Sequence, residues 1–159
     1  MNDFEKLSIS SALEGLINKK FTSLELTEFF IKRIENNKDL NCFITSTFDK
    51  AVEMAKVSDQ KIKENEIRPL EGIPIGMKDL FCTNGVRTTA GSKILENFIP
   101  FYESTVSNNL WNSGAIMLGK TNMDEFAMGS ANTTSFFGNV KNPLGSKVNK
   151  ELVPGGSSG

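Results

Sequence analysis

Apolar side chains recur every three or four positions in three stretches near the start of the chain, which is the spacing of one helix face. The first stretch, residues 8–19, predicts an amphipathic helix. The second follows Thr22, whose spacing to Glu25 is that of a capping box, and it ends in the polar run 36–39. The third, residues 48–64, predicts a mostly polar helix with a thin apolar side. These helices are expected to form a packing layer with solvated charged faces.

Short apolar runs between the helical stretches predict strands at residues 42–44, within residues 71–79 and at residues 115–118. A further helix is expected at residues 104–112, between the last two strands. Pro74 cannot donate a hydrogen bond to a neighbouring strand, so its strand is expected to be interrupted or to lie at an edge of the sheet. Helices that alternate with buried strands favour an α/β fold whose sheet is covered on both faces.

Length and charge narrow the class of protein. A chain of 159 residues is most typical of one domain, and its net charge of -1 gives no bulk attraction to nucleic acid or to an anionic membrane. No run is long enough to span a membrane, and the first residues lack the apolar segment of a signal peptide. We therefore expect a cytoplasmic protein with no membrane contact.

The chain has no histidine, which excludes a Ser-His-Asp or Cys-His mechanism within these residues. Its two cysteines, Cys42 and Cys82, lie far apart and outside any Cys-x-x-Cys spacing, so neither a disulfide framework nor a metal site is indicated. Both cysteines are expected to be small core residues.

Lys78 follows the apolar run 73–77, at the carboxyl end of a predicted strand. A lysine there is usually a solvated cap. A buried lysine would instead lose its proton more easily and could act as a general base. The closing Gly-Gly-Ser-Ser-Gly run is by itself most typical of a linker, but without histidine its hydroxyls, Ser157 and Ser158, are the natural partners for such a lysine.

Residues 114–121 match the literal pattern of a phosphate-binding loop, G-x-x-x-x-G-K-[ST]. In such a loop the strand comes before the first glycine, and the residues between the glycines form a turn. Here the intervening residues are Ala-Ile-Met-Leu, which read as the strand itself. The match is therefore interpreted as a coincidence, and no nucleotide site is expected there.

Four segments in this order resemble the amidase signature family: residues 72–79, 88–92, 118–129 and 154–159. The resemblance covers essentially the whole chain. It implies the N-terminal part of an α/β/α sandwich with a mixed central sheet, truncated and therefore incomplete as a domain. A mainly helical layer would occupy residues 1–66, and the start of the amidase core would occupy residues 67–159.

The family resemblance also implies a Ser-cisSer-Lys mechanism. Lys78 would be the general base of a proton relay, and Ser157 the relaying serine that follows a cis peptide bond. Gly156 and Ser158 would support this pair. The family's nucleophilic serine and oxyanion hole lie beyond Gly159, so we expect the chain to be inactive alone. Substrate would be lined by Met128, Gly129 and Ser130.

Within the family, residues 97–100 and 124–129 are most similar to the branch formed by the A subunits of glutamyl-tRNA(Gln) amidotransferases. This branch implies glutamine hydrolysis and transfer of ammonia within a heterotrimer that includes B and C subunits. ATP, Mg and most contact with Glu-tRNA(Gln) would belong to the B subunit, with no cofactor in this chain. Two alternatives stay open: a stand-alone amidase that hydrolyses small amides, and a non-catalytic remnant that only binds.

Overall fold

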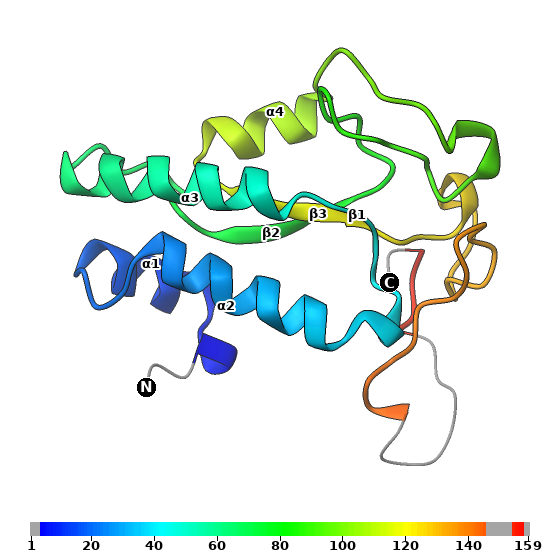
Figure 1. Cartoon of the computed structure of the whole chain (residues 1–159), viewed down its shortest axis with the longest axis horizontal. Helices are drawn as coiled ribbons and strands as arrows, with labels where there is room; N and C mark the ends of the chain where they lie inside the picture. The colour runs from blue at the N-terminus through cyan, green and yellow to red at the C-terminus, as the bar shows by residue number, and fades with distance from the viewer. Residues whose placement is uncertain (1–3, 146–153, 158–159) are drawn as a thin grey trace. The chain divides into compact units, whose positions relative to one another are not determined.

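The computed structural model describes residues 4–145 and 154–157 of the chain, and it contains each helix and strand that the sequence predicts (Figure 1). The elements are α1 (Ile9–Ile17), α2 (Ser23–Asn36), β1 (Phe43–Ser46), α3 (Phe48–Lys63), β2 (Pro74–Lys78), α4 (Thr105–Asn112) and β3 (Ile116–Thr121).

The predicted capping box starts α2. Thr22 N donates to Glu25 Oε2 over 2.7 Å, and Glu25 N donates back to Thr22 Oγ1 over 3.0 Å. These two reciprocal hydrogen bonds satisfy two of the amides that a helix start leaves unpaired. The local sequence therefore decides where α2 begins.

The three strands form a mixed sheet in the order β1-β3-β2, with β1 antiparallel to β3. Ile116 N donates to the carbonyl oxygen of Ile73 where β2 and β3 begin, and Asp79 N donates to that of Thr121 where they end. The two strands are therefore parallel, as expected of strands joined through a helix. Pro74 lies in β2, at the edge of the sheet, as predicted.

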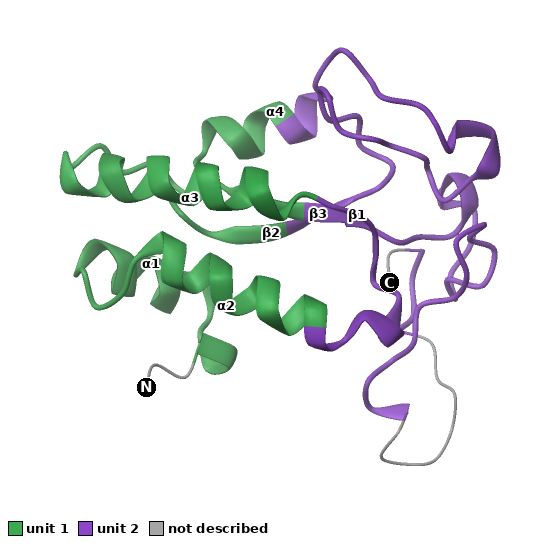
Figure 2. Ribbon diagram, in the orientation of Figure 1, with its two compact units in different colours: residues 1–35, 47–75, 108–118 green, residues 36–46, 76–107, 119–159 purple. Residues whose placement is uncertain are grey.

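The chain forms two compact units (Figure 2). One unit comprises residues 1–35, 47–75 and 108–118, and the other comprises residues 36–46, 76–107 and 119–159. The first unit holds an apolar cluster in which α1, α2, α3 and the start of β2 each bury side chains: Ala12, Leu16, Phe21, Leu26, Ile62 and Ile73.

A buried carboxylate also stabilises the first unit. Glu71 is 1% exposed and accepts hydrogen bonds from Arg68 Nε over 2.5 Å, from Arg68 Nη2 over 2.8 Å and from Ser58 Oγ. Burial by itself raises the pKa of Glu71, but the bonds from Arg68 and Ser58 outweigh it and leave the pKa lowered. The loop that precedes β2 is thereby joined to α3.

Two expectations from the sequence are corrected. Cys42 and Cys82 are half-buried rather than core residues. The apolar face of α1 is also narrower than the spacing of apolar residues in the predicted helix 8–19 indicates: Ile9 and Ile17 are 58% and 46% exposed, whereas Ala12 and Leu16 are buried.

The glycine and lysine of the coincidental phosphate-loop pattern, Gly119 and Lys120, lie inside β3. Their backbones therefore follow a strand rather than a turn, which agrees with the rejection of a nucleotide site there. Among the described residues, no helix is long and apolar enough to cross a membrane.

Candidate functional site

The structure brings Lys78 and Ser157 together across 79 residues of sequence. Lys78 is the last residue of β2 and is partly exposed. Its Nζ donates to Ser157 Oγ over 2.5 Å. This pair is the one that the sequence selected as a lysine base with a serine partner.

The neighbours of Lys78 explain how its side chain is placed. Met77 is 2% exposed and Asp79 is fully buried, so the backbone on either side of Lys78 is fixed by buried groups. Asp79 N also continues the pairing with β3 by donating to the carbonyl oxygen of Thr121 over 3.2 Å. Side chains alternate along a strand, which leaves Lys78 on the face opposite to its buried neighbours.

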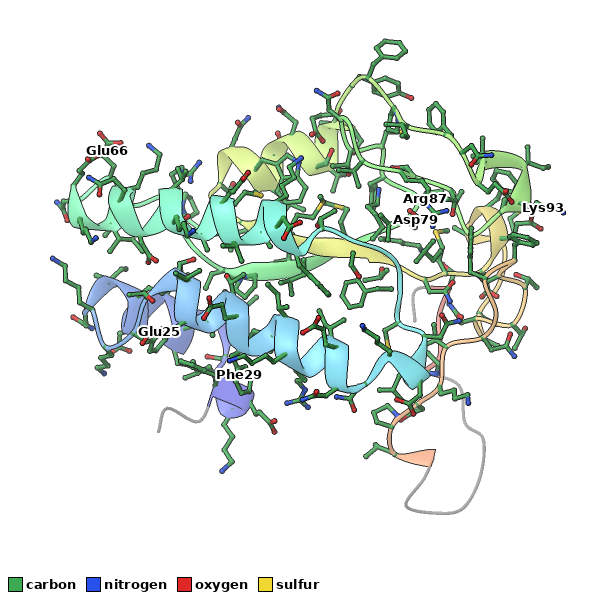
Figure 3. The ribbon with its side chains drawn as sticks, viewed as in Figure 1. Glu25, Phe29, Glu66, Asp79, Arg87 and Lys93 are labelled. Atoms are coloured by element: carbon green, nitrogen blue, oxygen red, sulfur yellow. The ribbon has the colours of Figure 1, made fainter. Side chains whose placement is uncertain are left out.

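Asp79 anchors the loop that follows β2 (Figure 3). Its carboxylate accepts hydrogen bonds from Thr89 N over 2.9 Å and from Thr89 Oγ1. Its carbonyl oxygen accepts from Ala90 N over 3.1 Å. Burial raises the pKa of Asp79, and the bonds from Thr89 oppose that shift only in part.

Lys120 is the buried cation beside Asp79. Its side chain is fully buried, and Nζ lies 4.0 Å from Asp79 Oδ1. Nζ also donates to the carbonyl oxygen of Phe81 over 2.5 Å and to Thr88 Oγ1 over 2.9 Å. Burial lowers the pKa of Lys120 to about 8.

Sequence reasoning missed this role of Lys120 and saw the residue only within the coincidental phosphate-loop pattern and the family-like segment 118–129. The signal that was present is its position two residues after the apolar run 115–118. A charge at such a position is buried unless the strand ends first, and a buried charge needs partners.

Ser157 is held by its backbone. Gly155 and Gly156 precede it with φ of 85° and 74°, a left-handed conformation that favours glycine. Gly156 N donates to the carbonyl oxygen of Ser130 over 2.7 Å. The carbonyl oxygen of Ser157 accepts from Asp124 N over 2.8 Å and from Asn132 Nδ2 over 3.3 Å.

The segment that holds Ser157 is folded around the carboxylate of Asp124. Asp124 Oδ1 accepts from Thr133 N over 2.8 Å, from Thr134 N over 3.1 Å and from Thr134 Oγ1 over 2.9 Å, while Oδ2 accepts from Asn132 N over 2.9 Å. Burial alone raises the pKa of Asp124, but these hydrogen bonds outweigh it and leave the pKa lowered. Asp124 is therefore held as a carboxylate.

Gly129 lies against that carboxylate. A Cβ added at Gly129 would lie 2.4 Å from Asp124 Cγ, which is closer than real side chains approach. Met128 is 78% exposed, and both Gly129 and Ser130 are exposed. Their expected contact with substrate remains a prediction, but Gly129 and Ser130 also have structural contacts, with Asp124 and Gly156.

Two further expectations about the closing segment have different outcomes. Ser158 lies outside the described residues. The expected cis bond before Ser157 is not found, because no peptide bond among the described residues is cis. A cis bond before a non-proline residue costs about 3–4 kcal/mol and needs surroundings that enforce it. Here the left-handed glycines bring Ser157 to Lys78 with trans bonds.

Within the described ranges, 4–145 and 154–157, no group of three His, Cys, Asp or Glu side chains has the geometry to hold a metal ion.

Comparison with known proteins decides the family. The family described as Amidase matches residues 25–159. The chain belongs to the amidase family. Solved structures share its fold: a chain from a vestigial protein complex, linked to the evolutionary origins of an s-triazine catabolic enzyme, superimposes with a TM-score of 0.86. That chain is 29% identical, and the match covers 96% of this chain and 33% of the other.

Two other relatives share one name. The A subunit of glutamyl-tRNA(Gln) amidotransferase from Rickettsia bellii is 57% identical over 100% of this chain and 32% of its own length. The crystal structure of the protein of that name from Thermotoga maritima has a TM-score of 0.73 and 31% identity, covering 99% of this chain and 31% of its own. This amidase chain thus spans about a third of the length of the relatives that it matches.

Proposed function

We propose that this chain is the N-terminal part of a glutamine-hydrolysing A subunit of a glutamyl-tRNA(Gln) amidotransferase. The observation that carries the proposal is the 2.5 Å hydrogen bond between Lys78 Nζ and Ser157 Oγ. It supplies a base and a hydroxyl in contact in a chain without histidine. The 57% identity to an A subunit supports glutamine as the substrate.

In the proposed reaction, Lys78 acts as the general base and accepts the proton of Ser157 Oγ, and Ser157 accepts a proton from the nucleophilic serine. That serine attacks the side-chain amide carbon of glutamine, and the C–N bond breaks as ammonia leaves with a returned proton. Water then hydrolyses the resulting glutamyl ester. We place the nucleophile and the oxyanion hole outside the 159 residues of this chain, so the chain supplies the relay.

The other residues of the site support this relay in the proposal. Gly156 lets the backbone turn so that Ser157 reaches Lys78, and Ser158 supplies a supporting hydroxyl next to it. Met128, Gly129 and Ser130 line the side of the site where glutamine binds. The exposure of Met128 leaves an apolar side chain available for the methylene groups of glutamine.

The ammonia released is proposed to pass to a B subunit, within a complex that also contains a C subunit. There ATP and Mg activate Glu-tRNA(Gln), and ammonia converts the activated glutamyl group to glutaminyl. Support for these partners comes from the name of the two relatives, which specifies glutamyl-tRNA(Gln).

The test uses the full-length polypeptide, produced with its partner subunits, and measures ammonia release from glutamine. Lys78→Ala and Ser157→Ala are each expected to lower kcat by about 10²–10⁴-fold, because a positioned acid–base group contributes that much. Lys93→Ala is the matched control, since Lys93 is an exposed lysine on the same unit, labelled in Figure 3. Near wild-type rates for both Lys78→Ala and Ser157→Ala would contradict the relay.

The same preparation separates the proposal from a stand-alone amidase. Co-purification of partner subunits and turnover of glutamine are expected. A full-length protein that purifies alone and hydrolyses small amides but not glutamine would instead assign the stand-alone activity.

A further inference from the structure

The side-chain amide of Asn132 donates to the backbone of Ser157. Asn132 Nδ2 lies 3.3 Å from the carbonyl oxygen of Ser157 and is the side-chain partner of that oxygen, beside the backbone donor Asp124 N. The Asn132 side chain is fully buried. A buried side-chain amide that donates a hydrogen bond to the backbone of another residue restricts where that residue can lie.

Asn132 is itself held by two further hydrogen bonds. Its N–H donates to Asp124 Oδ2 over 2.9 Å, and its Oδ1 accepts from Val140 N over 3.0 Å. Its φ is 53°, in the left-handed region where asparagine is enriched. Because Oδ1 is committed to an N–H donor, the amide nitrogen is the group that faces Ser157.

The donor on Asn132 is not needed to close its own loop. Asp124 already closes that loop by accepting from the backbone of residues 132–134 and from the Thr134 hydroxyl. The amide nitrogen of Asn132 instead reaches a residue 25 positions further along the chain.

Ser157 needs such an anchor. Gly155 and Gly156 before it are exposed and left-handed, and a Cβ added at either would meet no atom within 4 Å. Glycine loses the most conformational freedom when it is ordered, so the position of the serine depends on hydrogen bonds: from Gly156 N to the Ser130 carbonyl oxygen, and from Asp124 N and Asn132 Nδ2 to the Ser157 carbonyl oxygen. A proton relay requires Ser157 Oγ to stay within hydrogen-bond distance of Lys78 Nζ.

We propose that Asn132 is a positioning residue for the hydrolytic reaction. Its side-chain amide holds the carbonyl group of Ser157, and this keeps Ser157 Oγ within hydrogen-bond distance of Lys78 Nζ. This inference rests on the proposed relay role of Ser157. Asn132 Nδ2 bonds to the carbonyl oxygen of Ser157 rather than to Oγ, so in this proposal it acts through the position of Ser157.

Two substitutions remove the donor in different ways. Asn132→Asp keeps the shape, the left-handed preference and an oxygen for Val140 N, whereas Asn132→Gly keeps the backbone conformation and removes the whole side chain. In the full-length protein with its partner subunits, each is expected to lower kcat for glutamine about tenfold or more and to leave KM within about twofold. Asn139→Ala, which removes an exposed amide from the same stretch, is the control and is expected to keep wild-type kcat.

The decisive readout is a double-mutant cycle with Ser157→Ala. If Asn132 acts through Ser157, Asn132→Asp should change the residual kcat of the Ser157→Ala protein by less than about twofold. A purely structural role would lower the rate by the same factor in both backgrounds. Thermal unfolding and the yield of soluble protein are measured on the same samples.

Each outcome decides the point. Wild-type kcat in both Asn132 variants, or a loss that persists in the Ser157→Ala background, overturns the inference. If the activity of both variants falls only in proportion to the amount of folded protein, Asn132 contributes to folding alone, and the inference is also overturned. A wild-type protein that hydrolyses small amides but not glutamine overturns the proposed substrate, and the cycle is then run with that amide. If no amide is hydrolysed, the proposed function fails and the inference fails with it.

Discussion

At the scale of single residues, the unexpected feature is a fully buried ion pair next to the proposed base. Asp79 directly follows Lys78, and Lys120 lies beside Asp79 in the neighbouring strand. Asp79 Oδ1 has no hydrogen-bond partner among the described residues, so Lys120 at 4.0 Å is its principal compensation. Burying two charges costs free energy, and breaking such a pair costs more than replacing it whole.

Replacing Lys120 alone should therefore destabilise the protein more than replacing the pair. Lys120→Met leaves the Asp79 carboxylate buried without its cation, and we expect a loss of about 3–5 kcal/mol in the free energy of unfolding. Lys120→Met/Asp79→Asn should recover much of that loss. Denaturant unfolding of the full-length protein measures both, and a single variant as stable as the double variant would contradict the pairing.

Lys120 also predicts how stability depends on pH. Its pKa is about 8 in the folded protein against an ordinary value of 10.5, so between these pH values the unfolded chain binds more protons. The cost of burying the charged lysine is fully present below pH 8 and disappears as pH rises towards 10.5. Relative to Lys120→Met/Asp79→Asn, wild-type protein should therefore gain stability across this window in unfolding experiments at fixed salt. A flat or falling difference would show that the lysine keeps its ordinary pKa.

At the scale of elements, α2 shows how local and distant groups share one helix start. The Thr22–Glu25 box is local, but Asp59 on α3 also accepts from Ser23 N over 2.7 Å and from Leu24 N over 3.1 Å. The capping box can be predicted from the four adjacent residues 22–25. The contribution of Asp59 depends on how α2 and α3 pack, so no local pattern predicts it.

Glu25, labelled in Figure 3, lies in the first turn of α2. Glu25→Ala should lower the free energy of unfolding by about 0.5–2 kcal/mol, the cost typical of losing a helix cap. The Asp59 bonds remain in this variant, which favours the lower end of that range. Glu28→Ala removes an exposed glutamate from the same helix and should change stability by less than about 0.5 kcal/mol. Equal effects of the two substitutions in thermal unfolding would indicate that charge, rather than the cap, matters.

At the scale of the whole molecule, the chain contains the hydrogen-bonded pair Lys78 and Ser157 but spans about a third of its relatives' length. Each of the two compact units has its own buried groups: an apolar cluster with Glu71 in one, and the Asp79 and Asp124 networks in the other. The residues of the proposed relay, Lys78 and Ser157, and the residues that hold Ser157 all belong to the second unit.

The 159-residue polypeptide alone is expected to release no ammonia from glutamine, because the proposed nucleophile lies outside it. The measurement compares it with the full-length protein at equal concentration, with Lys78→Ala as the background control. Ammonia release by the short polypeptide that Lys78→Ala abolishes would show that the nucleophile is among these residues.

The order of helices and strands, the capping box of α2 and the edge position of Pro74 followed from the sequence by itself. These features depend on the spacing of apolar side chains and on what each backbone can donate, which are properties of neighbouring residues. The absence of histidine likewise indicated Lys78 as the candidate base, and Ser157 among the hydroxyls that could partner it.

Only the tertiary structure decided that Lys120 is buried beside Asp79, that Asp124 and Asn132 hold the Ser157 carbonyl, and that the bonds leading to Ser157 are trans. Each depends on segments distant in sequence that pack against one another. Those long-range contacts determine which side chains are buried, the backbone angles of the loops and the direction in which an amide points. The spacing of residues along the chain does not predict such contacts.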